Sequence, residues 1–192
     1  MKVAVTGGTG CLGQPLIDKL INSGMEIQLL VLPNDPEKKN LERKVNTISG
    51  DLNSLESLKL LTRDCKIIFH LASKVHTVPK TIDEKKEYYR VNVDGTRNLL
   101  EMASVNNVKR VVFYSTVGVY GKDADFHGNE LTPCKPSSVY AMNKYQAEQD
   151  ILNRFNNGGP EGVVLRFPVV YGPYDRGNMA HLIRAIKKKR FV

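Results

Sequence analysis

The stretch Lys2-Val3-Ala4-Val5-Thr6-Gly7-Gly8-Thr9-Gly10-Cys11-Leu12-Gly13 at the start of the chain decides its fold. Its first residues form a short apolar run that predicts a buried strand, and apolar residues at helical spacing follow. Glycines at 7, 10 and 13 permit a tight turn, close approach of a pyrophosphate and close packing of helix on strand. The N–H groups that begin such a helix bind anions. We therefore predict a dinucleotide-binding loop here.

Short apolar runs alternate with helix-like segments along the rest of the chain. Strands are expected at 2–6, 26–32, 45–49, 67–71, 110–115 and 163–167, and helices near 12–21, 55–61, 83–104, 138–155 and 179–186. This order predicts an α/β, Rossmann-like fold, with a doubly wound parallel sheet and helices on both faces. Residues 118–136 and 168–177 lack periodicity, and we expect them to form loops at the ligand-binding edge of the sheet.

The composition excludes several classes of protein. Hydrophobic residues at 41% and charged residues at 25% are ordinary values for a globular chain of 192 residues. Cys11, Cys65 and Cys134 lie too far apart for a disulfide framework or a zinc site, so we expect no metal. No uncharged stretch is long enough to span a bilayer or resembles a signal peptide. We therefore expect a soluble, cytoplasmic protein with no membrane partner.

The net charge of +8 does not by itself indicate a nucleic-acid partner. Five of the basic residues lie between 181 and 192, where there is no acid. The pattern of this segment predicts an amphipathic helix with a basic last turn, and cations at that end complement the helix dipole. No aromatic residues are interleaved with the basic run, so we expect no nucleic-acid binding.

Tyr140 and Lys144 place a phenol and an ammonium on one face of the helix expected over 138–155. A nearby cation favours the phenolate and lowers the pKa of a tyrosine. Tyr140 is thus a candidate acid/base that exchanges a proton with a substrate hydroxyl or carbonyl as hydride moves. The preceding strand ends in Ser115 and Thr116, whose hydroxyls can orient a substrate oxygen.

The end of the second strand does not identify the dinucleotide. An acid there would bind the ribose hydroxyls of NAD. The sequence is Leu30-Val31-Leu32-Pro33-Asn34-Asp35, so the first acid lies in the following loop. No arginine stands at the strand end to hold the extra phosphate of NADP, although Lys38 and Lys39 are near in sequence. The choice between NAD and NADP stays open.

Together these motifs resemble those of the extended short-chain dehydrogenases/reductases, the NAD-dependent epimerase/dehydratase family. The matching pieces follow the family order across nearly the whole chain. They are residues 6–13 (TGGTGCLG), 50–52 (GDL), 70–72 (HLA), 92–96 (NVDGT), 115–116 with 119–121 (ST, VYG), the Tyr140/Lys144 pair, 165–166 (LR) and 170–173 (VYGP).

The resemblance implies a role for each matched residue. Tyr140 would be the acid/base, Lys144 would tune it and hold the nicotinamide ribose, and Thr116 would be the catalytic hydroxyl that also contacts substrate. Asn178 would contact the diphosphate of a sugar nucleotide. The residues implied in cofactor binding are Gly7, Gly10, Cys11, Leu12, Gly13, Asp51, Leu52, Leu71, Ala72, Ser73, Asn92, Ser115, Tyr140, Lys144 and Phe167. The alternative for Asp51 and Asn92 is local turn or cap bonding.

The leading expectation is an NAD(P)-dependent enzyme that transfers hydride at a carbinol carbon of a sugar nucleotide, as an epimerase or dehydratase. The alternative is an NADPH-dependent ketone or aldehyde reductase, similar to dihydroflavonol reductases and hydroxysteroid dehydrogenases. A catalytically idle dinucleotide-sensing protein is a third reading, disfavoured by the intact set of Thr116, Tyr140 and Lys144. The resemblance also implies a homodimer formed through two long helices.

The resemblance predicts two domains of unequal size. Residues 1–167 would form the dinucleotide-binding Rossmann domain, and residues 168–192 would begin a C-terminal substrate-binding lobe. Extended members of the family continue beyond the equivalent of the last helix. We therefore expect a truncated chain with a short substrate lobe.

Overall fold

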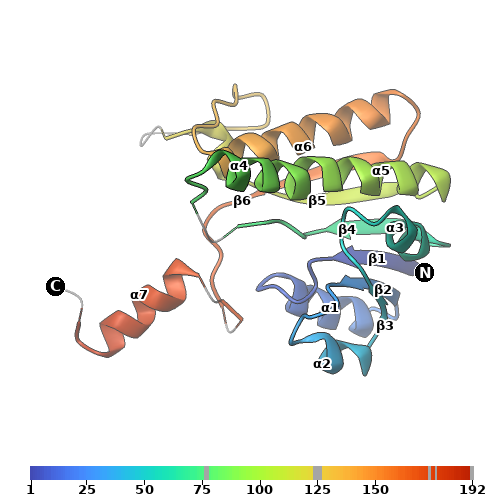
Figure 1. Cartoon of the computed structure of the whole chain (residues 1–192), viewed down its shortest axis with the longest axis horizontal. Coiled ribbons are helices and arrows are strands. Elements are labelled where there is room, and N and C mark those ends of the chain that lie inside the picture. Colours follow the sequence, from blue (N-terminus) through green and yellow to red (C-terminus); the bar gives the residue numbers. More distant parts are fainter. Residues whose placement is uncertain (76–77, 123–126, 173, 176, 191–192) are drawn as a thin grey trace.

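The computed structural model describes residues 1–75, 78–122, 127–172, 174–175 and 177–190. At its centre is a six-stranded parallel sheet with the order β3-β2-β1-β4-β5-β6 (Figure 1). The strands are β1 (Lys2–Thr6), β2 (Glu26–Val31), β3 (Asn46–Ser49), β4 (Ile67–His70), β5 (Arg110–Thr116) and β6 (Glu161–Phe167). The order reverses between β1 and β4, which confirms the predicted Rossmann-like topology.

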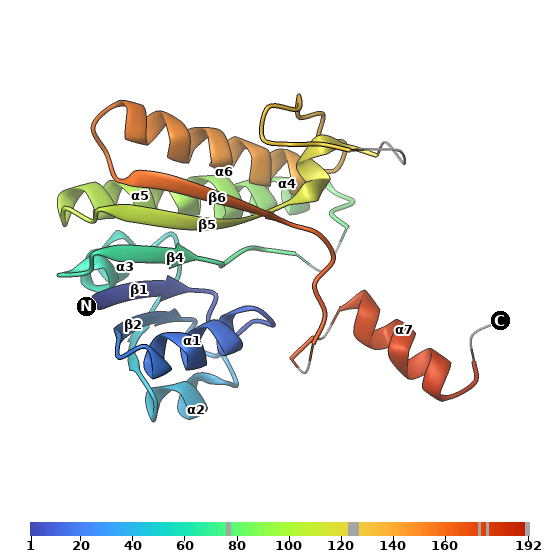
Figure 2. The same cartoon turned by 180° about the vertical axis from the view of Figure 1, so that it is seen from behind.

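Helices lie on both faces of the sheet (Figure 2). They are α1 (Gly13–Asn22), α2 (Lys38–Glu42), α3 (Leu55–Thr62), α4 (Ile82–Tyr89), α5 (Gly95–Val105), α6 (Val139–Asn156) and α7 (Asn178–Lys187). Because successive side chains of a strand point to opposite faces, β1 contributes to two separate cores. Val3 and Val5 pack with α1 and α2, whereas Ala4 packs with α3, α5 and α6.

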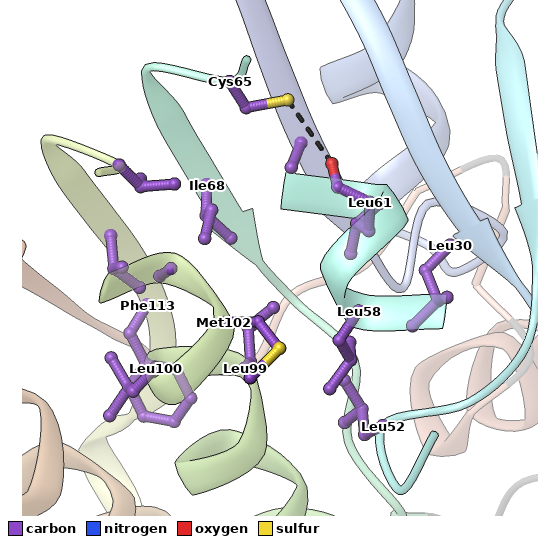
Figure 3. Packing of buried hydrophobic residues seen from close by; sticks show 14 of the residues in the cluster. Leu30, Leu52, Leu58, Leu61, Cys65, Ile68, Leu99, Leu100, Met102 and Phe113 are labelled. Atoms are coloured by element: carbon purple, nitrogen blue, oxygen red, sulfur yellow. Dashed lines mark hydrogen bonds between the residues drawn. The ribbon is translucent and has the colours of Figure 1, made fainter. Parts of the chain in front are cut away.

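The core under α3 and α5 is the larger of the two (Figure 3). Leu58 and Leu61 of α3 pack in one cluster with Leu99 and Met102 of α5 and Ile68 of β4. Leu58, Leu61, Ile68 and Leu99 are completely buried. Each such side chain contributes about 1.5–3 kcal/mol by leaving water, so this layer anchors the strands whose ends form the site.

The long helix expected over 83–104 contains a wide turn that the sequence did not predict. Between α4 and α5 lies η1 (Arg90–Asp94), a π-helical segment in which Gly95 N–H donates to the Arg90 carbonyl five residues earlier. A Cβ at Gly95 would lie 2.6 Å from Leu52 Cβ, so the glycine lets the continuous helical segment α4–η1–α5 pack against the loop after β3. Thr81 begins α4 with a capping box formed with Glu84.

Two further short elements occur where only loops were expected. The helix α2 has five residues and buries only Leu41, which is too little apolar periodicity to recognise in a sequence. The 3-10 turn η2 (Val117–Tyr120) starts where Thr116 Oγ1 accepts a hydrogen bond from Gly118 N. The last helix, α7, extends away from the sheet (Figure 2), and none of its described side chains is buried. Within the described ranges, no helix is both long and apolar enough to cross a bilayer.

Candidate active site

A cavity of about 720 Å³ opens at the carboxyl ends of the strands, where the strand order reverses. Its volume falls in the range of about 300–1,000 Å³ usual for small-molecule and cofactor sites. Most residues proposed from the sequence line it together: Gly7, Gly10, Cys11, Leu12, Gly13, Asp51, Leu52, Leu71, Ala72, Ser73, Ser115, Thr116, Tyr140, Lys144 and Phe167. The fold thus brings residues from both halves of the chain to one site.

The glycine loop between β1 and α1 forms one wall of this cavity. Gly7 has a φ of +73°, and a Cβ on it would lie 2.5 Å from Ala72 N. A Cβ at Gly13 would lie 2.3 Å from the Gly7 carbonyl oxygen. At Gly10 the nearest atom would be Gly7 O at 3.3 Å, so the space beside this exposed glycine is open toward the cavity.

The same loop fits the pyrophosphate of a dinucleotide. Gly7 and Gly13 are required by backbone packing, which leaves Gly10 as the position where a ligand can approach the main chain. No side chain caps the first turn of α1, all of which is described. The N–H groups of this turn are already bonded, because those of Gly13 and Gln14 donate to the Gly10 carbonyl and that of Leu16 donates to the Leu12 carbonyl. An anion here would be attracted by the positive end of the helix dipole.

The far end of the cavity is lined from β2 and from the loops after β2 and β3. Asp35 and Asp51 supply two carboxylates, and the described lining residues between 30 and 53 include no cation, whereas Arg90 of η1 also borders the cavity and interacts electrostatically with Asp51. Asp35 Oδ1 accepts from Glu37 N at 2.9 Å, and Asp51 Oδ1 accepts from Asn53 N at 2.7 Å. The local turn bonding considered for Asp51 is therefore present, and the residue also borders the cavity.

Tyr140 and Lys144 lie on the first turns of α6, which Ser138 caps by accepting a hydrogen bond from Ala141 N at 3.1 Å. The expected lowering of the Tyr140 pKa is not found: burial raises it, opposed by a hydrogen bond with Ser73. Lys144 is 2% exposed, and burial lowers its pKa to about 7. Desolvation thus outweighs the attraction between the two groups that their spacing suggested.

Asn92 lies behind the cavity wall and is not among the residues that line it. It is 3% exposed, and its Oδ1 accepts hydrogen bonds from Ser73 Oγ at 3.0 Å and Lys74 N at 2.7 Å. Its Nδ2 donates to the Lys74 carbonyl at 3.0 Å. The wide turn η1 carries this side chain, so Asn92 holds the segment that presents Ser73 to Tyr140.

A second buried hydrogen-bond chain fixes the ends of β1 and β4. His70 Nδ1 lies 2.7 Å from Thr6 Oγ1, and Nε2 lies 2.9 Å from Thr96 Oγ1. Thr96 already donates its hydroxyl proton to the Asn92 carbonyl, so Nε2 carries the imidazole proton and Nδ1 accepts from Thr6. Burial lowers the pKa of His70 to about 3, which keeps the ring neutral.

Several lining residues were not recognised from the sequence. Lys74 was not among the residues predicted to bind cofactor or substrate, yet it borders the cavity, and its Nζ lies 3.8 Å from Glu87 Oε1. Arg90 and Asp175 border it as well. These residues come from loops and helix ends without periodicity, so only the resemblance of neighbouring motifs could have indicated them. Pro173 and the side chain of Asn178 lie outside the described structure.

Residues 3–191 match the NAD dependent epimerase/dehydratase family. A curated relative, the 4-hydroxy-2-methyl-3-oxo-4-farnesyl-3,4-dihydroquinoline-1-oxide ketoreductase of Stigmatella aurantiaca, is 32% identical over 100% of this chain and 57% of its own length. Similarity of this kind is spread along the chain and is not confined to the glycine loop.

Solved structures with the same fold include two sugar-nucleotide proteins. The dTDP-glucose 4,6-dehydratase DesIV of Streptomyces venezuelae, solved with NAD, has a TM-score of 0.87 and 25% identity over 98% of this chain and 63% of its own. MoeE5, solved with UDP-glucose and NAD, has a TM-score of 0.81 and 35% identity over 96% of this chain and 60% of its own. This chain therefore spans about three-fifths of the length of these three proteins.

Proposed function

Because the chain belongs to the NAD dependent epimerase/dehydratase family, whose members are enzymes of the short-chain dehydrogenase/reductase type, we propose that it binds NAD in the cavity described above and acts on a carbinol carbon there. The observation that carries the proposal is the meeting of the Gly7–Gly13 loop with Thr116, Tyr140 and Lys144 around one cavity. Bound NAD would supply the hydride acceptor.

We propose NAD in preference to NADP on the charge of the adenosine end. Asp35 and Asp51 can accept hydrogen bonds from ribose hydroxyls, and their negative charge would repel an additional phosphate. Lys38, which is near in sequence, lies 3.8 Å from Glu42 and does not border the cavity. Asp35 would thus take the role usually given to an acid at the end of the second strand.

The side chains of Tyr140, Thr116 and Lys144 would carry out the proton transfer that accompanies hydride transfer. The Tyr140 phenol would exchange a proton with the substrate oxygen, and the Thr116 hydroxyl would orient that oxygen. The ammonium of Lys144 would stabilise the phenolate, which is otherwise disfavoured because burial raises the pKa of Tyr140. Since the pKa of Lys144 is about 7, its charge is only partly present near neutral pH, and groups that preserve this charge gain importance.

The substrate class we propose is a sugar nucleotide, with epimerisation or dehydration as the net reaction. The support is the fold shared with a dTDP-glucose dehydratase and with a protein solved with UDP-glucose. A ketone reductase is the second candidate, because a ketoreductase is 32% identical over the whole chain. Nucleotide retained after purification would favour the first class, and NADH or NADPH consumed in proportion to a carbonyl substrate would favour the second.

The decisive experiment combines nucleotide identification with one variant. The nucleotide that co-purifies is identified, and sugar nucleotides and carbonyl compounds are then screened for turnover. Tyr140→Phe should lower kcat by about 10²-fold or more with little change in NADH affinity. Tyr145→Phe, on the same helix but away from the cavity, is the matched control. Full activity of Tyr140→Phe would remove the proposed acid/base. The division of domains at residue 167, the homodimer and the cytoplasmic location stay predictions.

A further inference from the structure

A buried carboxylate that the proposed chemistry does not use lies near the middle of α6. Glu148 is one helical turn after Lys144 and two turns after Tyr140, on the same face of the helix. Its side chain is completely buried. Its oxygens accept a hydrogen bond from Ser115 Oγ and bonds from the Arg166 guanidinium, with Nη2 to Oε2 at 2.7 Å and Nε at 3.2 Å from each oxygen.

The partners of Glu148 come from the two strands that end at the cavity. Ser115 of β5 and Arg166 of β6 are opposite each other in the strand register, so their side chains project from the same sheet face toward α6. Arg166 also donates from Nη1 to Tyr120 Oη at 2.7 Å. One carboxylate thus joins α6, which carries Tyr140 and Lys144, to the ends of β5 and β6.

Stability alone does not account for such a group. Taking a carboxylate and a guanidinium out of water is costly, and apolar residues of similar size usually hold a helix on a sheet at least as well. The position of the charge is informative instead. Lys144 is 2% exposed, and its Nζ lies over the Phe113 ring, 3.9 Å from the centroid. Burial lowers the pKa of Lys144, and Glu148 is the group that opposes this shift.

We propose that Glu148 is a positioning residue for the acid/base pair: it fixes α6 against Ser115 and Arg166, and it supplies the negative charge that keeps Lys144 an ammonium. The use of that ammonium rests on the proposed function, whereas its ionisation does not. Besides Tyr140, the titratable groups near the cluster include His70 of β4, which is neutral, Arg166 of β6, Tyr120 of η2 and Cys134 of the loop before α6.

The test follows the ionisation of Lys144 directly. The full chain is prepared with lysine labelled with ¹³C at Cε, and the Lys144 signal is assigned by its loss in Lys144→Met. Its titration is recorded from pH 5 to 10 in wild type and in Glu148→Gln. Glu148 is one helical turn from Lys144 on the same face of α6, and its negative charge favours the ammonium, so loss of that charge should lower the midpoint. NADH affinity, measured by fluorescence at pH 7.5, should fall with it.

Two further variants separate the charge effect from a general loss of structure. Glu161→Gln breaks the Arg110–Glu161 pair, which joins the first residues of β5 and β6, at the edge of the sheet away from the cavity. It should leave the Lys144 midpoint and NADH affinity unchanged. Glu148→Gln combined with Arg166→Met removes both charges of the buried pair, so it should fold even where the single variant does not. Its Lys144 midpoint should also be lower than in wild type.

The outcomes distinguish the inference from the proposed function. An unchanged Lys144 midpoint in Glu148→Gln, or in the double variant where the single one does not fold, would overturn the role of Glu148. A lowered midpoint with weakened NADH binding would support it. If wild type itself does not bind NADH, the proposed function fails, and the titration still decides whether Glu148 controls the charge of Lys144.

Discussion

Replacement of Gly13 and of Gly10 by alanine should separate the folding role of the glycine loop from its ligand-binding role. At Gly13 a Cβ would lie 2.3 Å from Gly7 O, 2.5 Å from Gly8 Cα and 2.6 Å from Gly8 C, all of them main-chain atoms that cannot rotate away. Overpacking of this kind costs about 1–3 kcal/mol, and the rigid surroundings place Gly13→Ala at about 3 kcal/mol. For a chain of this length that lowers Tm by about 6–12 °C.

Gly10→Ala should give the opposite pattern. Its Cβ would meet only Gly7 O at 3.3 Å, so the free energy of unfolding should change by less than about 1 kcal/mol. The methyl group would instead occupy the space that a pyrophosphate needs. We expect NADH affinity to fall by tenfold or more, which corresponds to at least about 1.4 kcal/mol.

Thermal unfolding and NADH fluorescence titration of the two variants check both expectations. Gly172→Ala is the matched control, because a Cβ there would have no neighbour within 4 Å. Equal Tm values for Gly13→Ala and Gly172→Ala would refute the packing argument. NADH binding by Gly10→Ala as tight as that of wild type would refute the assignment of the open space to phosphate.

Two other perturbations test the cavity and its support. Asp35→Ala should weaken NADH binding by about tenfold and reduce the preference for NADH over NADPH, because a hydrogen-bond acceptor and a negative charge are lost together. An unaltered ratio of the dissociation constants for NADH and NADPH would contradict the proposed role of Asp35. His70 has a folded-state pKa of about 3 against about 6.5 when unfolded, so its contribution is complete above pH 6.5 and is lost as the pH falls toward 3. At pH 4.5 the loss should be about 2–3 kcal/mol by the linkage slope, and Tm measured against pH should fall less steeply in His70→Gln.

The fold could be predicted because its signals are local in the sequence. The strand, glycine loop and helix at residues 2–22 fix the first unit, and alternating apolar runs place the other strands to within about two residues of their observed bounds. The elements that were missed carry weak signals. The helix α2 buries one side chain, and the π-helical turn η1 differs from an α-helix by a hydrogen-bond shift that leaves composition unchanged.

The sequence could indicate which residues form the candidate site, but it could not indicate the pKa values of their side chains. Most of the proposed residues border one cavity, because the carboxyl ends of parallel strands meet at one edge. The pKa of Tyr140 was not predictable, since it depends on how deeply the phenol is buried and on where the Lys144 ammonium points. The cofactor role of Asn92 was implied by the resemblance of its motif and stays a prediction, and only the structure shows that its side chain holds Ser73 and Lys74.

The helical segment that contains η1 is sensitive to its length. The wide turn holds one residue more than an α-helical turn, whereas each residue of the α-helical part turns the helix by about 100°. Removal of one residue from 95–98 would therefore rotate the rest of α5 by that angle if η1 stayed as it is. Leu99 and Ala103, both completely buried, would then leave the core if Asn92 kept its hold on Lys74. The reverse arrangement would keep the core and lose that hold. The number of residues in the helical segment α4–η1–α5 is therefore constrained. A single deletion in it should be more harmful than almost any substitution on its exposed face.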